Sequence, residues 1–357
     1  MPRILIAGGG LAGAAAACEL ARAGRRVTVL ERNTGPTDKI CGEFLSAAAQ
    51  HYLTRLGVDF LALGGQVITR VRIVRGAQMA EADLPFAGLG LSRRLLDEAL
   101  LRRAVGCGAE VLRETVTELS PDIRFLATGK HDLPGVRRPV DGRSADLVGF
   151  KTYFRLSPSE QAAVSGTVEV ILLNDGYAGL LLVEDGRANL CLLINRDRLA
   201  RVGGTWPALL DDLRSESAHL RRRLLDAEAL MARPLAIARV PYGFIHTPGT
   251  AETMFRLGDQ ACVISSFSGA GMSIALHSAA IAVQCHLNGA PPAHYYHRLR
   301  NDVAGSIHRA GKLYRIGSWV PGQPWLFHAL QLWPGLIRRA AAATRVRKSA
   351  WLHDQRR

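Results

Sequence analysis

Apolar and polar positions follow three different patterns along the chain, and each pattern predicts a different kind of element. Residues 3–32 read as an apolar run, a glycine turn, an alanine-rich stretch and a second apolar run, which predicts strand, helix and strand. Residues 66–74 and 149–194 alternate with period two, which predicts antiparallel strands, and NDG and EDG turns divide the second region into hairpins. Helical spacing is expected from about Leu45, over residues 92–108 behind a Ser92 cap, over 205–224, and from about Met272.

The order of these elements predicts a discontinuous domain organisation. A chain of 357 residues allows about two domains. In the strand of residues 66–74, Val71 and Ile73 share one face and Arg70 and Arg72 the other, as expected for a half-exposed strand outside the first domain. We expect a Rossmann-like α/β domain of residues 1–65, 88–145 and 240–290, an antiparallel β-sheet domain of residues 66–87 and 146–239, and a C-terminal helical segment of residues 291–357.

The N-terminal glycine turn has the chemistry of a dinucleotide-binding site. Gly8, Gly10 and Gly13 fit G-x-G-x-x-G, which allows a tight turn, close approach of a pyrophosphate to main-chain amides, and close packing of helix on strand. Ala12 and the alanines after it keep the helix thin. Glu31 closes the second strand, where its carboxylate can accept from ribose hydroxyls and would repel the 2′-phosphate of NADP. The complete context favours a dinucleotide site over an ordinary glycine turn.

Two later stretches repeat the arrangement of a strand running into a turn. Residues 122–130 read as a strand that runs into a turn at Thr128 and Gly129, and a strand at Phe255 runs into Gly258 and Asp259. A helix start that faces a ring can stabilise negative charge on that ring. Such a helix start is predicted at Gly269, Gly271 and Met272.

Composition and charge narrow the classes of partner. The net charge of +14 would suit nucleic acid, but the arginines are spread along the chain and no nucleic-acid motif accompanies them, so no nucleic-acid partner is expected. The six cysteines show no C-x-x-C spacing, which favours reduced thiols, a cytoplasmic location and no metal site. The chain enters a strand at once, without the pattern of a signal peptide, which also argues against export.

In this order, the stretches resemble the FAD-dependent oxidoreductases built like p-hydroxybenzoate hydroxylase, a superfamily that includes aromatic-ring monooxygenases, flavin halogenases and geranylgeranyl reductases. The resemblance spans about Arg3 to Leu287 and implies a Rossmann-like FAD-binding domain of the glutathione reductase type. It implies that Arg93 reaches the flavin phosphate or ribityl region and that Asp259 contacts the ribityl chain. The other FAD contacts that it implies are Gly8, Gly10, Ala12, Gly13, Glu31, Arg32, Cys41, Gly42, Thr128, Gly129, Gly258, Gly269, Gly271 and Met272.

Within that superfamily, residues 39–46, KICGEFLS, resemble the K-x-C-G-E segment of the geranylgeranyl-reductase-like branch. Cys41 could lie beside the flavin or be a small buried hydrophobe. Glu43 could donate a proton, but an acid at the start of the Leu45 helix is the favoured interpretation. The chain lacks the W-x-W-x-I-P of tryptophan halogenases and a second G-x-G-x-x-G, and it retains only Tyr177 of the reductase Y-x-W-x-F-P.

The resemblance implies an FAD enzyme with NAD(P)H as a transiently bound electron donor. The leading hypothesis is a monooxygenase that hydroxylates a lipophilic aromatic or polyketide-type molecule through a flavin C4a-hydroperoxide, protected from water by an apolar cavity. The alternative is a reductase of isoprenoid double bonds. A halogenase or a flavoprotein without turnover ranks lower, and the sequence identifies no catalytic side chain.

The C-terminal segment allows two interpretations. Trp319, Trp325, Trp333 and Trp351 lie among prolines and basic residues such as Arg338. Aromatic residues beside a basic helix are typical of a membrane-surface attachment. A helical arm with a solvated basic face explains the same pattern equally well. The sequence therefore predicts a cytoplasmic protein and leaves two alternatives open: the C-terminal segment attaches it to the inner membrane surface, or the segment is a solvated helical arm.

Overall fold

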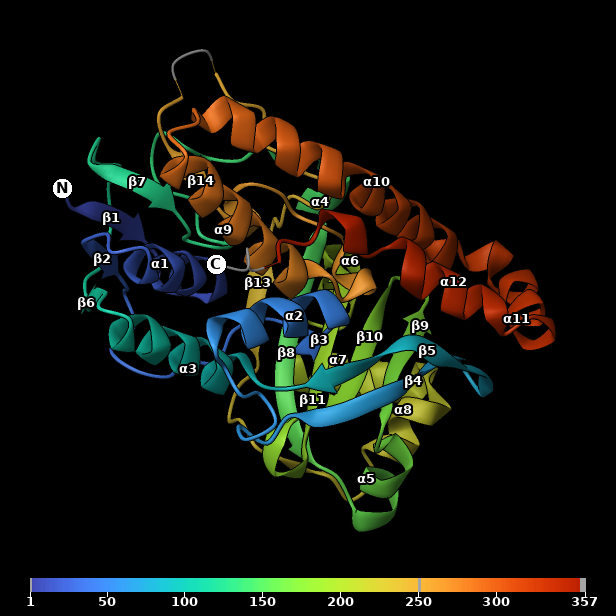
Figure 1. Ribbon diagram of the computed structural model, residues 1–357. Coiled ribbons are helices and arrows are strands. Elements are labelled where there is room, and N and C mark those ends of the chain that lie inside the picture. The colour runs from blue at the N-terminus through green and yellow to red at the C-terminus, as the bar shows by residue number, and fades with distance from the viewer. Residues whose placement is uncertain (1, 250–251, 354–357) are drawn as a thin grey trace.

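Two β-sheets form the centre of the molecule, and helices cover both (Figure 1). The computed structural model describes residues 2–249 and 252–353. The first sheet is entirely parallel, as expected for a Rossmann-like α/β domain, and this confirms the predicted fold class. Its strands, in order across the sheet, are β14 (Phe255–Arg256), β7 (Ile123–Leu126), β1 (Ile4–Ala7), β2 (Val27–Leu30) and β6 (Glu110–Leu112).

Small side chains allow helices to pack closely on the parallel sheet. The alanines of α1 (Leu11–Arg22) are buried between that sheet and the helices α3 (Arg93–Gly106) and α9 (Gly271–Leu287). A Cβ at Gly13 would lie 1.8 Å from the Gly8 carbonyl oxygen, so this position requires glycine. Ser92 caps α3 as predicted, because its Oγ accepts from the Leu95 N–H. Helix α2 (Ala47–Leu56) begins two residues after the predicted Leu45, which instead pairs in a short strand.

The second sheet is larger and mixed. Every pair in it is antiparallel apart from β4 and β9, which run parallel. The NDG and EDG turns join β9, β10 and β11 as two hairpins, as predicted. Its strands are β12 (Glu228–Ala229), β8 (Leu147–Arg155), β11 (Arg187–Asn195), β10 (Gly176–Leu182), β9 (Thr167–Leu173), β4 (Gln66–Arg75), β5 (Gln78–Gly90) and β3 (Phe44–Leu45), with β13 (Leu235–Ala238) also paired to β8.

Short helices cover the face of this sheet that is turned away from the first domain. Apolar side chains of α7 (Trp206–Glu216) and α8 (Ala218–Arg223) pack against β8 to β11. The single helix predicted over residues 205–224 is wrong, because the backbone leaves the helical region at Ser217, whose Oγ then caps α8 by accepting from the Leu220 N–H. The remaining short helices are α4 (Gly142–Ala145), α5 (Pro158–Val164) and α6 (Arg196–Arg201).

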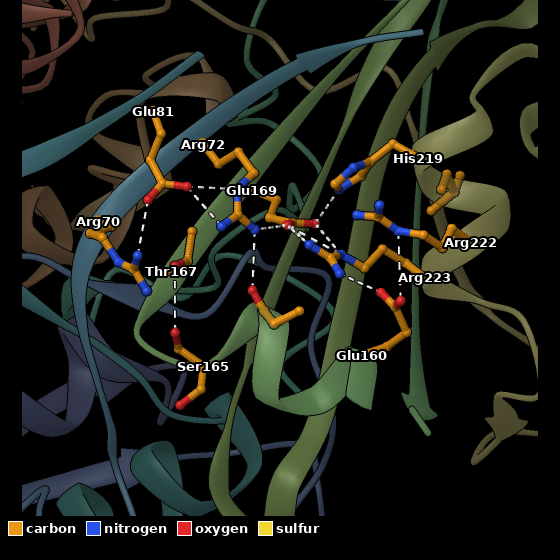
Figure 2. A network of polar contacts seen from close by, with 12 residues as sticks. Arg70, Arg72, Glu81, Glu160, Ser165, Thr167, Glu169, His219, Arg222 and Arg223 are labelled. Carbon is orange, nitrogen blue, oxygen red and sulfur yellow. Dashed lines mark hydrogen bonds and ion pairs between the residues drawn. The ribbon is translucent and has the colours of Figure 1, made fainter. Parts of the chain in front are cut away.

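A buried charge cluster joins two of these strands to the covering helices. Figure 2 shows Arg72 of β4, His219 and Arg223 of α8 converging on Glu169 of β9. Arg72 was expected on an exposed face, yet its residue exposure is only 8%. It can be buried because its guanidinium contacts Glu169 Oε1 at 2.5 Å and Glu81 Oε2 at 2.7 Å, so the charge is compensated.

The C-terminal segment is helical, as predicted, and forms an arm along one edge of the molecule (Figure 1). Its helices are α10 (Pro292–Ser318), α11 (Gln323–Leu332) and α12 (Gly335–Ala343). After α12 the chain returns to the first domain, where the Leu352 N–H donates to the Tyr52 hydroxyl and the Leu352 carbonyl lies 2.7 Å from His51 Nε2. None of the helices in the described ranges is long and apolar enough to cross a membrane.

Two cysteines that are distant in sequence are neighbours in the fold. The Sγ atoms of Cys18 in α1 and Cys107 after α3 lie 3.4 Å apart, although 89 positions separate them. Both are free thiols. Burial, followed by the adjacent Cys107 thiol, raises the pKa of Cys18 to about 12, so Cys18 is a poor nucleophile. Sequence spacing gave no sign of this pair.

Candidate functional site

A cleft of about 770 Å³ lies between the parallel sheet and the inner side of the second sheet, which is within the usual range for cofactor pockets. The elements that form it are the β1–α1 turn, the loop before β3, the start of α3, the turn after β7, strand β13 and the start of α9. Gly13 lies outside the lining. The predicted site residues in the lining are Gly8, Gly10, Ala12, Glu31, Arg32, Cys41, Gly42, Arg93, Thr128, Gly129, Gly258, Asp259, Gly269, Gly271 and Met272.

Two helices begin at this cleft, and neither has a capping side chain. Gly10 precedes α1 and Ala270 precedes α9, and no acidic residue stands in the first turn of either helix. The first N–H groups of a helix have no partner within it, and together with the helix dipole they attract anions. Gly10 and Met272 both line the cleft. The two helix starts thus suit a ligand with two separate electron-rich groups.

The cleft-lining glycines leave room that a side chain would fill. A Cβ built on Gly42, Gly129 or Gly271 meets no atom within 4 Å, so each faces open space. Gly8 is different, because a Cβ there would lie 2.4 Å from the Ala127 carbonyl oxygen. Gly8 therefore fits the turn to the neighbouring strand, while the other three keep the cleft wide. These residues fit an extended dinucleotide such as FAD.

Glu31 is held in place by main-chain donors at the cleft edge. Its Oε2 accepts from the Gly9 N–H at 2.7 Å and its Oε1 from the Asn33 N–H at 2.9 Å. Burial raises the pKa of Glu31, but the two N–H groups and Lys39 outweigh burial and hold the pKa below its usual value. The carboxylate is therefore ionised at neutral pH, as an acceptor for ribose hydroxyls requires.

Basic side chains surround the middle of the cleft. Arg93 forms a two-bond ion pair with Asp97, at 2.6 and 2.8 Å, so its guanidinium is already oriented. Burial lowers the pKa of Lys39, although Glu31 and Asp97 oppose that effect. Arg32 Nη2 lies 2.7 Å from His131 Nε2, and burial followed by Arg32 lowers the pKa of His131. The positive charge suits a pyrophosphate.

Glu43 has a different role from the one that its sequence position suggested. The interpretation as a first-turn acid of the following helix is wrong, because the Glu43 side chain is fully buried and reaches the start of α3. Its Oε1 accepts from the Arg93 N–H at 2.8 Å and from Lys151 Nζ at 2.6 Å, and its Oε2 accepts from the Tyr153 hydroxyl at 2.8 Å. Burial raises the pKa of Glu43, and Lys151 only partly opposes this.

This Glu43–Lys151–Tyr153 cluster connects the cleft to the second sheet. Glu43 has a left-handed backbone, with φ of 57°, which is uncommon outside glycine and turns the chain from the cleft loop into β3. Tyr153 also reaches Asp38, whose carboxylate oxygen is 3.4 Å from the phenol oxygen, and Asp38 lines the cleft. The cluster therefore holds the loop of residues 38–43 against β8.

The part of the cleft nearest the second sheet is mostly apolar. Two hydroxyl groups interrupt it, those of Tyr242 and Ser266, which lie 3.2 Å apart. Ser266 Oγ is also 2.5 Å from the Tyr177 hydroxyl. Burial raises the pKa of Tyr242, so it is a neutral phenol that can donate a proton in a hydrogen bond. The apolar residues in this part of the lining are Leu235, Ala236, Ile237, Val240, Val263 and Ile264.

Comparisons with known proteins agree with this geometry. The family described as "Pyridine nucleotide-disulphide oxidoreductase" matches residues 3–70. A menaquinone reductase of Mycolicibacterium smegmatis is 24% identical over 80% of this chain and 76% of its own. A solved flavin-dependent brominase superposes with a TM-score of 0.77 at 16% identity, over 98% of this chain and 96% of its own. This chain is an FAD-dependent oxidoreductase. A squalene monooxygenase of Mus musculus is 42% identical over 16% of the chain and 10% of its own.

Which side chains of this FAD-dependent oxidoreductase contact FAD stays a prediction, as do the exact domain boundaries. Sequence reasoning did not find Lys151 and Tyr153, or the apolar wall from β13. One signal was present for Lys151, a single charge within the apolar strand sequence GFKTYF. For the β13 wall no local signal exists, because only the folding of the second sheet brings it to the cleft. Within the described ranges, no cluster of histidine, cysteine and carboxylate side chains could hold a metal ion.

We expect a Gly271→Leu variant to lose at least tenfold in FAD affinity while the apoprotein unfolds at an unchanged temperature. The new side chain meets no protein atom near its Cβ, so it enters the cleft without straining the fold. Flavin fluorescence titration of the apoprotein measures the affinity. Gly142→Leu is the matched control, because Gly142 is also the first residue of a helix with open space around it, away from the cleft. An equal loss of FAD affinity in Gly271→Leu and Gly142→Leu would contradict the prediction that Gly271 lines the FAD site.

Proposed function

We propose that this FAD-dependent oxidoreductase is a monooxygenase that hydroxylates a lipophilic aromatic or polyketide-type molecule. The observation that carries the proposal is the apolar end of the cleft, which adjoins the start of α9. Such a wall binds an apolar substrate and excludes water from the reacting atoms. FAD, when bound, supplies the redox chemistry. The squalene monooxygenase similarity supports oxygen insertion, although only over a short stretch.

The protein's own groups would bind and orient the two reactants. The N–H groups at the start of α1 and α9 would hold the phosphates and the electron-rich edge of the cofactor ring. Tyr242 and Ser266 would hydrogen-bond the one polar group of an otherwise apolar substrate, with Tyr242 as the proton donor. We place NAD(P)H as the external electron donor, bound transiently. The balance is then substrate, O2, NAD(P)H and a proton going to hydroxylated substrate, water and NAD(P)⁺.

Isotope labelling tests this proposal directly. Small molecules that co-purify with the protein are identified by mass spectrometry and then turned over with NADPH or NADH under ¹⁸O2. We expect the product mass to increase by one labelled oxygen atom. A Tyr242→Phe variant should bind the substrate about tenfold more weakly, since one hydrogen bond is worth about 1 kcal/mol or slightly more, with FAD content unchanged. Product that forms with no oxygen incorporated would overturn the monooxygenase proposal.

A second candidate is a flavin-dependent reductase of isoprenoid double bonds or of a quinone ring. The similarity to menaquinone reductase over most of the chain favours it, as does the K-x-C-G-E segment at residues 39–43. In this case Tyr242 would lie where a proton donor to the reduced bond is needed. The same assay without oxygen separates the two candidates, because a reductase turns over anaerobically and a monooxygenase does not.

A further inference from the structure

The tip of the C-terminal arm exposes an unusual amount of apolar side chain. We call this set the tryptophan patch: Ile316, Trp319, Trp325, Leu332, Trp333 and Leu336, with exposures of 49, 62, 78, 56, 62 and 40%. Ile316 lies at the end of α10, Trp325 and Leu332 in α11 and Leu336 in α12, while Trp319 and Trp333 directly follow α10 and α11. The ends of these helices lie together at the far end of the arm (Figure 1). Large exposed apolar patches of this kind mark interaction sites.

Within α11, the exposed residues of the patch lie on the face opposite to the buried residues of that helix. Trp325 and Leu332 are seven positions apart, so their side chains project from one face of α11, and Trp333 directly follows the helix. On the opposite face of α11, Phe327 and Leu330 are buried against the second sheet. The tryptophans are therefore not needed to attach the arm to the rest of the molecule.

The charge around the patch favours one class of surface. Residues 303–353 contain eight lysines and arginines and no aspartate or glutamate. Lys312, Arg315, Arg338 and Arg339 are exposed beside the patch. A protein partner commonly meets a patch with mixed charge at its rim, whereas a rim of one positive sign complements the headgroups of anionic lipid. Tryptophan is also the residue that prefers the boundary between headgroups and hydrocarbon.

We propose that the tryptophan patch docks this protein on the surface of an anionic lipid bilayer. No helix of the described chain could cross the membrane, so the attachment is an interfacial one. Trp319, Trp325 and Trp333 enter the headgroup layer, and the surrounding lysines and arginines pair with lipid phosphates. These contacts are electrostatic, so binding weakens as the salt concentration rises.

The inner side of the arm reaches the apolar end of the cleft. Tyr314 of α10 packs edge-on against Tyr177 at 6.0 Å between ring centroids, and Tyr177 bonds Ser266, which lines the cleft. Phe267 and Leu326 complete the apolar contact between arm and cleft wall. If the proposed function holds, the arm joins the docked surface to the wall of the site that an apolar substrate would occupy. The docking itself does not depend on that function.

Vesicle co-sedimentation of the FAD-loaded protein tests the docking. We expect binding to phosphatidylcholine vesicles with 30% phosphatidylglycerol, much weaker binding to pure phosphatidylcholine, and loss of binding in high salt. A Trp325→Ser/Trp333→Ser variant should bind at least tenfold more weakly. The matched control is Leu61→Ser/Leu225→Ser, which removes two side chains of similar exposure, 57 and 61%, far from the arm. Unfolding temperatures of both variants verify that the folds are intact.

Two kinds of result would overturn the proposal. The first is a failure of the vesicle assay: either wild-type protein does not sediment with phosphatidylglycerol vesicles at low salt, or the tryptophan variant sediments as well as wild type. The second is a lipid-free dimer, seen by light scattering, that the tryptophan substitutions dissociate while vesicle binding is absent, because the patch would then be an interface between two copies of the chain. Neither readout uses turnover, so failure of the hydroxylation assay leaves this test unaffected.

Discussion

A Glu169→Gln variant is expected to lose about 3–5 kcal/mol of unfolding free energy, the usual cost of removing one partner from a buried ion pair. Glu169 is fully buried and is contacted by Arg72, Arg223 and His219 at 2.5, 2.7 and 2.8 Å (Figure 2). An amide cannot compensate two guanidinium charges in that position. Urea unfolding followed by circular dichroism measures the loss as a lower midpoint at an unchanged slope.

The same substitution should change the acid stability of the protein. Burial raises the pKa of Glu169, but His219 and Arg223 outweigh burial and lower it to about 2, below the ordinary value of 4.5. A depressed pKa in the folded state stabilises the fold above the unfolded pKa, and that stabilisation is lost as the pH falls from about 4.5 to 2. Glu160 and Glu81 are the other carboxylates that face the cluster. Wild type should therefore lose stability more steeply than Glu169→Gln in this window.

Glu81→Gln is the matched control for the buried cluster. Glu81 binds Arg70 and Arg72 at the solvent side of the same network, where its side chain is 30% exposed. Arg70 is 45% exposed and can be screened by water, and Arg72 keeps its ion pair with Glu169, so we expect a loss of about 1 kcal/mol or less. Equal losses for Glu81→Gln and Glu169→Gln would contradict the interpretation that burial of the central carboxylate makes the cluster essential.

A Glu43→Gln variant is expected to lose a similar 3–5 kcal/mol, because Lys151 is fully buried and would have no anionic partner. It should also bind FAD more weakly, since Glu43 joins the cleft loop of residues 38–43 to the first N–H of α3, where Arg93 lies. Chemical unfolding of the apoprotein and flavin titration measure the two effects separately. Loss of FAD affinity with full stability would contradict this role.

A double variant separates the charge from the packing. Glu43→Gln combined with Lys151→Met removes both charges, so it should recover much of the stability that Glu43→Gln alone loses. Tyr153 then keeps its hydrogen bond to the amide oxygen at position 43. If the double variant is less stable than either single variant, the two residues act independently and the ion pair has no special role.

Local patterns were sufficient to predict the start of the first sheet and the hairpins of the second sheet. The G-x-G-x-x-G turn, the alternation in β8 to β11 and the Ser92 cap each depend on residues that are close in sequence. The glycines that line the cleft could also be predicted from the sequence, because a backbone that approaches a ligand needs a residue without Cβ. The burial of Arg72 could not be predicted from the sequence, because the alternation of β4 does not reveal that Glu169 of β9 lies beside Arg72.

The parts of the site that sequence could not predict depend on contacts between distant segments. Glu43 and Lys151 meet across 108 positions, and nothing near Glu43 indicates a buried lysine. The break at Ser217 is a local exception outside the site, because its Oγ accepts from the Leu220 N–H while the helical pattern continues on both sides. Contacts between segments far apart in the sequence thus limit the prediction of the site more than weak helix or strand propensities do.

The C-terminal arm follows α9 of the first domain and returns to that domain at Leu352, so both of its ends are attached to the same body. The return contact joins Leu352 to Tyr52, Tyr52 lies 2.7 Å from His277 Nδ1 in α9, and His277 Nε2 lies 3.1 Å from Asp302 of α10. A segment fixed at two points resists rotation about either one. Any surface that holds α11 therefore also sets the direction in which the cleft opens, so the molecule would sit on that surface with a single orientation rather than pivot on a tether.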